Sequence, residues 1–259
     1  MDIARLKMEA MAFRTRLHDA KRRATDGNFG WYPYGTLDNF TVLDLLLTGP
    51  NRDLMALIGE GPAVDIGAAD GDTAFFLESL GVPMHVVDYP PTNFNGCRGV
   101  RALRDALGSK VEILETDLDR QFTLPGRHYR FAFFLGILYH LKNPFGALEA
   151  LSEHAAHAVV STRIARFNRA VDGAPGGDGV NGERVSLRTV PVGYLVDPQE
   201  CNNDYTNYWI FSEAGLRRLF DRSGWDVLEF ATFGNTRDSD PARTDGDERA
   251  FALLRSRRG

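Results

Sequence analysis

Apolar residues recur along the chain at two alternating spacings. From 3 to 23 they recur every three or four residues, which predicts an amphipathic helix. From about 37 to 165, short apolar runs alternate with stretches of helical periodicity. The runs predict strands at 62–66, 84–88, 111–115, 131–135 and 158–162, and the periodic stretches predict helices at 73–80, 100–107 and 145–155. Strands joined by crossover helices indicate a parallel sheet with helices on both faces.

The region 168–208 breaks this alternation. Glycine and proline are frequent between 172 and 193, which predicts an inserted loop that closes over the site as a lid. A helix over 212–223 and two strands over 225–232 and 249–255 follow. We therefore predict an N-terminal helix and aromatic loop in 1–36, and one α/β domain in 37–259 that carries the insertion at 168–208.

Composition narrows the class of protein. A hydrophobic fraction of 43% with 25% charged residues is typical of a globular chain. The net charge of −5 argues against a broad electrostatic footprint for nucleic acid, although the helix over 3–23 is locally basic. Two cysteines exclude a disulfide framework and a four-cysteine zinc site, so no metal is expected. Without a long apolar segment or a signal peptide, we expect a soluble cytoplasmic protein with no membrane partner.

A glycine-containing loop follows the first predicted strand. The sequence there is Val64-Asp65-Ile66-Gly67-Ala68-Ala69-Asp70-Gly71-Asp72. Its two glycines permit a tight turn close to a ligand, as in sites for NAD, FAD or S-adenosylmethionine (SAM). The three acids would repel a pyrophosphate but suit a ligand that carries a sulfonium and an ammonium group. Helix capping is an alternative role for Asp70 or Asp72.

Two further acids stand at strand ends. Asp88 follows the second strand, and its carboxylate can accept hydrogen bonds from both hydroxyls of a ribose. Asp117 follows the third strand, where an acid often faces an adenine amine. A turn at the end of a strand is the simpler explanation for each of them.

With these motifs, residues 60–165 resemble the core of class I SAM-dependent methyltransferases. Asp65-x-Gly67-x-Ala69-x-Gly71, Asp88 and Asp117 match the first three motifs of that family in order and spacing, with Ala69 where glycine is common. The resemblance implies a Rossmann-like doubly wound sheet, mostly parallel with a reversed terminal strand, and SAM as cofactor. The residues it places around the cofactor are Trp31, Tyr34, Asp65, Gly67, Ala68, Gly71, Asp88, Tyr89, Asp117, Leu118, Leu135, Gly136 and Tyr139.

A narrower resemblance rests on residues 133–144 and 207–212, which are similar to the bacterial tRNA wobble-uridine carboxymethyltransferases and their small relatives. That family uses a carboxylated SAM, held partly by a basic residue in an N-terminal loop. The corresponding loop here, 31–35, is aromatic and contains no Lys or Arg. We therefore expect ordinary SAM and a small-molecule acceptor, with tRNA as the less favoured partner.

Candidate catalytic residues follow the fourth and fifth strands, where open α/β sheets bind ligands. His140 is expected to accept a proton, Tyr139 to shape the pocket beside the sulfonium, and Arg163 to hold an anionic substrate group. A backbone partner for His140 and a surface ion pair for Arg163 are the alternatives. The expected wall of the substrate side is Tyr205, Asn207, Tyr208 and Trp209.

The predicted function is transfer of a methyl group from SAM to an oxygen, nitrogen or carbon atom of a small metabolite. Three alternatives remain: an enzyme that modifies tRNA at the wobble uridine, a SAM-binding regulatory protein without catalysis, and a nicotinamide-dependent oxidoreductase, which the acidic loop disfavours. The sequence leaves a homodimer open.

Overall fold

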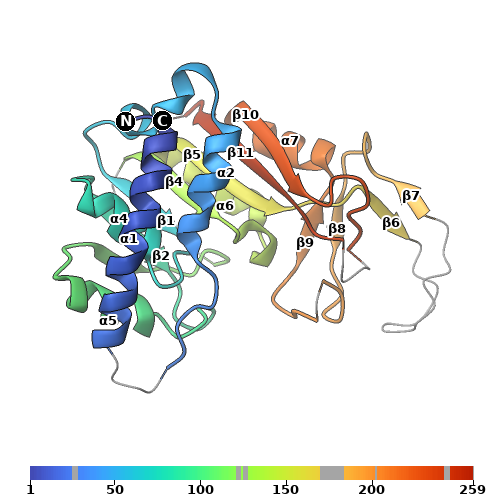
Figure 1. Ribbon diagram of the computed structural model, residues 1–259. Coiled ribbons are helices and arrows are strands. Elements are labelled where there is room, and N and C mark those ends of the chain that lie inside the picture. Colours follow the sequence, from blue (N-terminus) through green and yellow to red (C-terminus); the bar gives the residue numbers. More distant parts are fainter. Residues whose placement is uncertain are drawn as a thin grey trace.

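The computed structural model describes residues 1–24, 29–120, 124, 128–169, 184–201, 203–241 and 246–258. A seven-stranded sheet forms its centre, in the order β10-β11-β5-β4-β1-β2-β3 (Figure 1). Its strands are β1 (Ala63–Ile66), β2 (Met84–Asp88), β3 (Glu112–Glu115), β4 (Tyr129–Leu135), β5 (Ala155–Arg163), β10 (Trp225–Gly234) and β11 (Glu248–Ser256). Strands β1 to β5 pair in parallel, whereas β11 is antiparallel to both of its neighbours. The prediction of a mostly parallel sheet with a reversed terminal strand is confirmed.

Helices cover both faces of this sheet. They are α1 (Ile3–Arg23), α2 (Asn39–Leu46), α3 (Leu54–Ile58), α4 (Asp72–Ser79), α5 (Arg98–Leu107), α6 (Pro144–His154) and α7 (Glu213–Arg222), with short 3-10 turns at Thr36–Asp38, Gly49–Arg52 and Leu138–His140. The first five pack their apolar residues into the core on one face, and α6 and α7 pack theirs on the other. Helix α1 lies beside α2 on the outer side of its layer (Figure 1).

Strand β4 shows why the apolar runs predicted strands so well. Phe131 and Phe133 belong to the core under α1 to α5, while Ala132 and Phe134 belong to the core under α6 and α7. Successive side chains of a strand point to opposite faces, so a strand covered on both faces is apolar at every position.

The structure differs from the sequence predictions mainly in the insertion. Where a loop was predicted, the structure has short paired strands, β6 (Phe167–Arg169) with β7 (Arg184–Ser186) and β8 (Gly193–Leu195) with β9 (Trp209–Phe211). Most of the predicted lid, 172–183, lies outside the described residues. Helices α2 and α3 were also not predicted.

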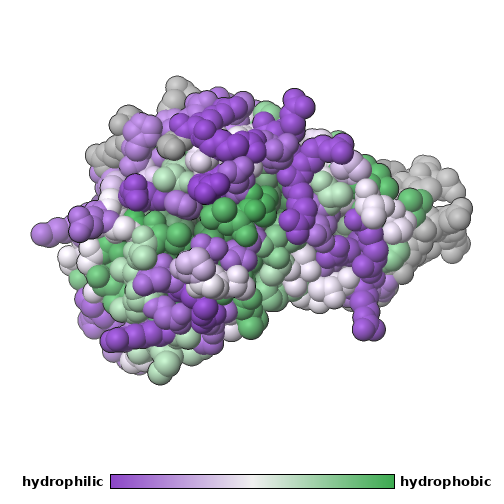
Figure 2. All heavy atoms as spheres, turned by 90° about the horizontal axis from the view of Figure 1, so that it is seen from above, coloured by the Kyte–Doolittle hydropathy of each residue, from purple (hydrophilic) through white to green (hydrophobic). Residues whose placement is uncertain are grey.

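Figure 2 shows the face that lies uppermost in Figure 1, which is mostly hydrophilic with apolar side chains gathered near its middle. Within the described part of the chain, no helix is both long and apolar enough to cross a bilayer.

Candidate functional site

The turn after β1, residues 67–72, is here called the glycine loop. Gly67 and Gly71 have φ of 67° and 82°, in the left-handed region that favours glycine. A Cβ on Gly67 would lie 2.2 Å from Cγ2 of Ile137, so the loop is pressed against the segment after β4. Ala69 also has a positive φ, 54°, which gives a physical reason why glycine is common at this motif position. The glycine loop is thus a tight turn at the carboxyl end of the sheet.

Two acids, Asp65 and Asp88, lie side by side under this loop. Both are buried, and burial followed by the charge of Asp88 raises the pKa of Asp65 to about 8. Burial also raises the pKa of Asp88, against hydrogen bonds from the side chain of Asn93 (2.9 Å) and the backbone N–H groups of Tyr89 (2.8 Å) and Ala69 (3.1 Å). Neither carboxyl group has a basic side chain as partner among the described residues. This pair is therefore an acidic site without a counter-cation.

Asp70 and Asp72 have a different environment, which corrects the expectation that three acids of the motif face the ligand together. Lys21 of α1 lies 3.3 Å from Oδ2 of Asp70 and 3.3 Å from Oδ1 of Asp72. Asp70 also accepts hydrogen bonds from the backbone of Tyr32 (2.8 Å) and from the side chain of Asn95 (2.8 Å). These two acids tie the N-terminal segment to the glycine loop, and Lys21 neutralises them in part.

Several other predicted cofactor residues lie at the carboxyl ends of the strands. Ala68 is buried in the glycine loop, and Tyr89 directly follows Asp88. After β3, Asp117 accepts a hydrogen bond from the backbone of Asp119 (3.1 Å), and Leu118 packs at the edge of the core. Leu135 is the last residue of β4, and Gly136, with a φ of 76°, follows it. The sheet brings these residues to the same edge, and their contacts with a cofactor stay predictions.

The aromatic loop, residues 29–35, runs past the glycine loop. Trp31 lies under Nζ of Lys21, 5.4 Å from its ring centroid, and packs against the core. Tyr34 is largely exposed and meets the ring of Tyr32 edge-on. Burial and the neighbouring Tyr139 raise the pKa of Tyr32, while Arg249 opposes this. Tyr32, which was not among the predicted cofactor residues, therefore lies within electrostatic reach of Tyr139 and Arg249.

The ends of β4, β5 and β11 bring Tyr139, Arg163 and Arg249 together. Arg249 donates a long hydrogen bond from Nη1 to the hydroxyl of Tyr139 (3.4 Å). Nε of Arg163 lies 2.9 Å from Oδ1 of Asp247, an ion pair that is not in hydrogen-bonding geometry. Asp247 also lies 3.7 Å from Nε of Arg249. The ion pair considered for Arg163 is therefore present, but the arginine in it is buried rather than at the surface.

His140 is half-buried and has a defined tautomer. Its Nδ1 lies 3.0 Å from the backbone carbonyl of Thr206 and 2.9 Å from the hydroxyl of the same residue. That hydroxyl donates its proton to Asp204 (2.6 Å), and a carbonyl oxygen only accepts, so Nδ1 must carry the proton. Nε2 is then a bare acceptor, and it has no hydrogen-bond partner in the part of the chain that the structure describes.

The predicted substrate wall is mixed in character. Tyr205 is 75% exposed, whereas Asn207 is buried and its Oδ1 has no hydrogen-bond partner among the described residues. The backbone N–H of Tyr208 donates to the carbonyl of Tyr139 (2.8 Å), which ties this segment to the end of β4. Trp209 donates from Nε1 to the carbonyl of Lys142 (3.2 Å). Their substrate role stays a prediction.

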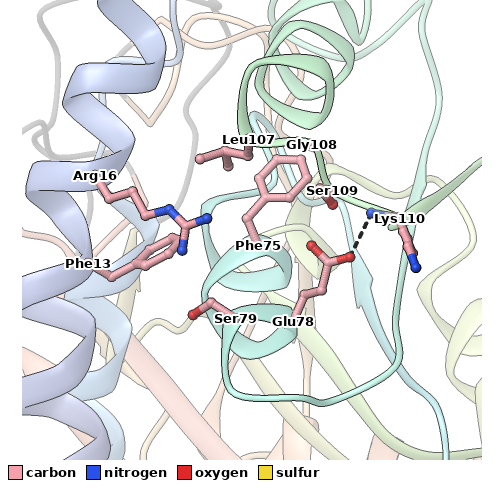
Figure 3. A pocket seen from close by; sticks show the side chains of 9 residues that line it. All are labelled: Phe13, Arg16, Phe75, Glu78, Ser79, Leu107, Gly108, Ser109 and Lys110. Carbon is pink, nitrogen blue, oxygen red and sulfur yellow. Dashed lines mark hydrogen bonds between the residues drawn. The ribbon is translucent and has the colours of Figure 1, made fainter.

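Two cavities lie beside α1. One, of about 220 Å³, lies between α1, α4 and the end of α5, and side chains of α1 and α4 such as Phe13 and Phe75 line it (Figure 3). It lies at the end of α4 opposite to the glycine loop. The second, of about 350 Å³, lies between α1 and the aromatic loop and reaches Asp72.

Comparison with known proteins decides the family. A model of the family described as "Methyltransferase domain" matches residues 46–229. The chain belongs to this methyltransferase-domain family. Family membership confirms the prediction of a methyltransferase that uses SAM, whereas nothing found supports the tRNA wobble-uridine family in particular. No curated protein matches this methyltransferase in a sequence search.

Solved structures resemble the methyltransferase in fold. The N-terminal domain of EvdMO1 with S-adenosylhomocysteine (SAH) bound is 17% identical, with a TM-score of 0.53 over 94% of this chain and 97% of that one. A putative methyltransferase from Bacillus halodurans is 13% identical, with a TM-score of 0.52 over 78% and 98% of the two chains. TehB from Haemophilus influenzae is also 13% identical, with a TM-score of 0.51 over 79% and 60%.

The residues present fit SAM. Its sulfonium and ammonium groups are cations, and Asp65 and Asp88 form a buried acidic pair without a basic partner among the described residues. Asp88 receives three hydrogen bonds from the chain, so one of its four lone-pair sites remains for a ribose hydroxyl. When bound, SAM would supply the electrophilic methyl group. The chain would align the acceptor and take up its proton.

Proposed function

We propose that this methyltransferase acts on an oxygen, nitrogen or carbon nucleophile of a small-molecule metabolite, with His140 as general base. The observation behind this proposal is that Nε2 of His140, after the end of β4, carries no proton and has no hydrogen-bond partner among the described residues. Burial lowers the pKa of His140 below its usual value, and the charges of Arg249 and Arg163 act in the same direction against Thr206 and Asp204. The imidazole is therefore neutral at pH 7 and able to accept a proton.

The reaction asks two things of the chain, alignment of the nucleophile and acceptance of its proton. It aligns the nucleophile with the methyl group, and such alignment contributes on the order of 7–11 kcal/mol. SAM, when bound, would supply the methyl group, which would leave the sulfur as the nucleophile bonds to it. A nucleophile that holds its proton at neutral pH passes it to Nε2 of His140, and the Thr206 and Asp204 contacts fix the orientation of the ring.

A small acceptor is favoured over tRNA by the surface of α1, which was the only support for an RNA contact. Most of its basic side chains pair with acids of the same chain. The pairs are Arg5 with Glu9, Lys7 with Asp44, Arg14 with Asp38, Lys21 with Asp70 and Arg22 with Asp19. Cations already paired release few counterions on binding a phosphate backbone, so this helix offers RNA little electrostatic affinity.

The test is turnover with SAM, read as SAH release, on fractionated small metabolites and on total tRNA from the same cells. We expect turnover on a small-molecule fraction and none on tRNA. On the acceptor found, His140→Gln should lower kcat by about 10²–10⁴-fold while SAH affinity stays the same. The control is His128→Gln, at an exposed position before β4, which should leave kcat unchanged.

The pH profile gives an independent readout. Neutral His140 is the active form, so kcat should fall as the pH drops through its lowered pKa, and this limb should vanish in His140→Gln. An unchanged kcat in the variant would mean that alignment alone suffices. SAH binding without turnover on any fraction would instead support the regulatory alternative.

A further inference from the structure

Two arginines face each other at the end of β5. Arg163 and Arg249 are direct partners in the antiparallel register of β5 and β11. Directly opposed residues project from the same face of a sheet, and like charges at such positions destabilise the strand pair. An arrangement of this kind requires negative charge close by.

The chain supplies only part of that charge. Asp247 is the one acid within ion-pair distance of either guanidinium among the described residues, at 2.9 Å from Arg163 and 3.7 Å from Arg249. One carboxylate against two guanidinium groups leaves a net positive charge. Across the cluster, Asp204 is committed to the backbone and hydroxyl of Thr206, and His140 is neutral.

Arg163 is also short of acceptors. Its side chain is 7% exposed, and its one ionic partner among the described residues is Asp247, through a contact that is not in hydrogen-bonding geometry. A buried charge is costly unless it is paired and hydrogen-bonded. The planar donor fork of arginine matches a carboxylate or a phosphate, to which it donates two parallel hydrogen bonds. The guanidinium of Arg163 is thus suited to bind an anion through two of its oxygens.

The position of the pair places this anion on the acceptor. Nη1 of Arg249 lies 3.7 Å from the place of a Cβ on Gly136, so its guanidinium reaches the cofactor end of β4. Arg163 lies one strand further from β1 than β4 does, roughly 10 Å from the glycine loop at the usual strand spacing. The charges of both arginines also help to lower the pKa of His140, so the pair lies near the imidazole.

We infer that the methyl acceptor is a small-molecule acid whose carboxylate or phosphate group is held by Arg163 and Arg249, an inference that rests on the proposed function. The anion completes the charge balance of the arginine pair and anchors the acceptor beside Nε2 of His140. Substrates whose negative group has been neutralised lose this anchor.

The first experiment compares acids with neutral analogues on the wild-type protein saturated with SAH. Small carboxylates and phosphomonoesters are titrated against their amides or alcohols, for example salicylate with salicylamide, nicotinate with nicotinamide, and phenyl phosphate with phenol. We expect saturable binding by acids, at least tenfold tighter than by their neutral partners. Equal affinity within the pairs, or no binding by any acid, overturns the inference.

The second experiment uses variants. In Arg163→Met the best acid should bind at least tenfold more weakly, and Arg163→Lys, which keeps the charge but loses the fork, should fall between. The matched control is Arg255→Gln, which changes an exposed arginine of β11 paired with Asp226. If Arg163→Met does not fold, the half-buried Arg249→Gln serves in its place and should also weaken acid binding.

SAH affinity, measured on the same samples, separates the possible failures. We expect it to stay within about twofold in the Arg163 variants, because the pair holds the acceptor. An equal loss of affinity for SAH and for the acid would mean that the arginines hold the carboxylate of the cofactor. That result would overturn this inference but leave the proposed function standing. Wild-type protein that does not bind SAH would overturn the proposed function as well.

Discussion

The two halves of the candidate site contain ionisable groups of opposite sign that the chain itself leaves without a full set of partners. The cofactor half, formed by β1, β2 and the glycine loop, buries Asp65 and Asp88 without a basic partner among the described residues. The acceptor half, at the ends of β4, β5 and β11, holds Arg163 and Arg249 against the single carboxylate of Asp247. Each half has the charge that its proposed ligand needs, a cationic cofactor on one side and an anionic acceptor on the other.

The halves also differ in how they are held. In the cofactor half, hydrogen bonds from Ala69, Tyr89 and Asn93 orient the Asp88 carboxylate before any ligand arrives. In the acceptor half, the contact of Arg163 with Asp247 is not in hydrogen-bonding geometry, and Nε2 of His140 lacks a hydrogen-bond partner within the described residues. The first half is preorganised by the chain, and the second is completed by its ligand.

The largest effect is expected where the two halves touch, at Gly67. In Gly67→Ala the residue would keep a φ of 67° and its Cβ would meet Ile137 at 2.2 Å. The left-handed backbone costs about 1–2 kcal/mol and the overpacking about 1–3 kcal/mol. We expect a loss of about 2–5 kcal/mol in the free energy of unfolding and loss of SAH binding, measured by denaturant melts and calorimetry.

The control for this variant is Gly108→Ala, whose φ is 63° but whose Cβ would meet nothing within 4 Å. It should show only the backbone cost, with normal SAH binding. Adding Ile137→Ala to Gly67→Ala should recover part of the stability by removing the clash. Equal losses in the two glycine variants would show that the contact between the halves contributes nothing.

The sequence predicted the strands and the tight glycine turn of the cofactor half because their signals are local. A strand buried on both faces is a continuous apolar run, and the spacing of Asp65, Gly67 and Gly71 spans a single turn. Asp88 was predicted because it ends the next strand. Local spacing did not show that Lys21, 49 residues before Asp70, neutralises that acid.

The acceptor half could be predicted only in part. Arg163 and His140 were recognised as candidates because they follow strands, but Arg249 was not. It meets Arg163 through the register of two antiparallel strands 86 residues apart in sequence, and no local pattern fixes that register. The strands of the insertion, β6 to β9, contain three residues each, too few to show a period.

A smaller effect is expected at Asp65. Its pKa of about 8 lies above the ordinary 3.8, so the folded protein without ligand binds this proton more tightly than the unfolded chain does. The stability it contributes is complete below about pH 4 and is lost as the pH rises to about 8. A cationic cofactor favours the ionised form, so SAM binding near pH 7 should release up to one proton, measured by calorimetry in buffers of different ionisation enthalpy.

In Asp65→Asn this proton release should disappear, stability should vary less between pH 5 and 8, and SAM should bind about tenfold more weakly. Asp226→Asn is the control, because Arg255 lowers the pKa of that exposed acid and it stays ionised over this range. If proton release persists in Asp65→Asn, another group loses the proton when SAM binds. Asp65 would then not be the carboxyl group that ionises to pair with the cationic cofactor.

The smallest effect is expected at Lys21, which tests whether Asp70 and Asp72 belong to the cofactor half. Lys21→Met removes the lysine that forms ion pairs with both acids, whereas Lys7→Met, on the same helix, leaves Asp44 paired with Arg52 at 2.7 Å. Lys21→Met should therefore cost about 1–2 kcal/mol of stability and Lys7→Met less than about 1 kcal/mol. Because the acids tie α1 to the loop rather than face the ligand, SAM affinity should change less than in Asp65→Asn. A change as large as in Asp65→Asn would mean that Asp70 and Asp72 act on the cofactor as Asp65 and Asp88 do. The distinction between an acidic pair that faces the ligand and a pair that Lys21 neutralises would then be wrong.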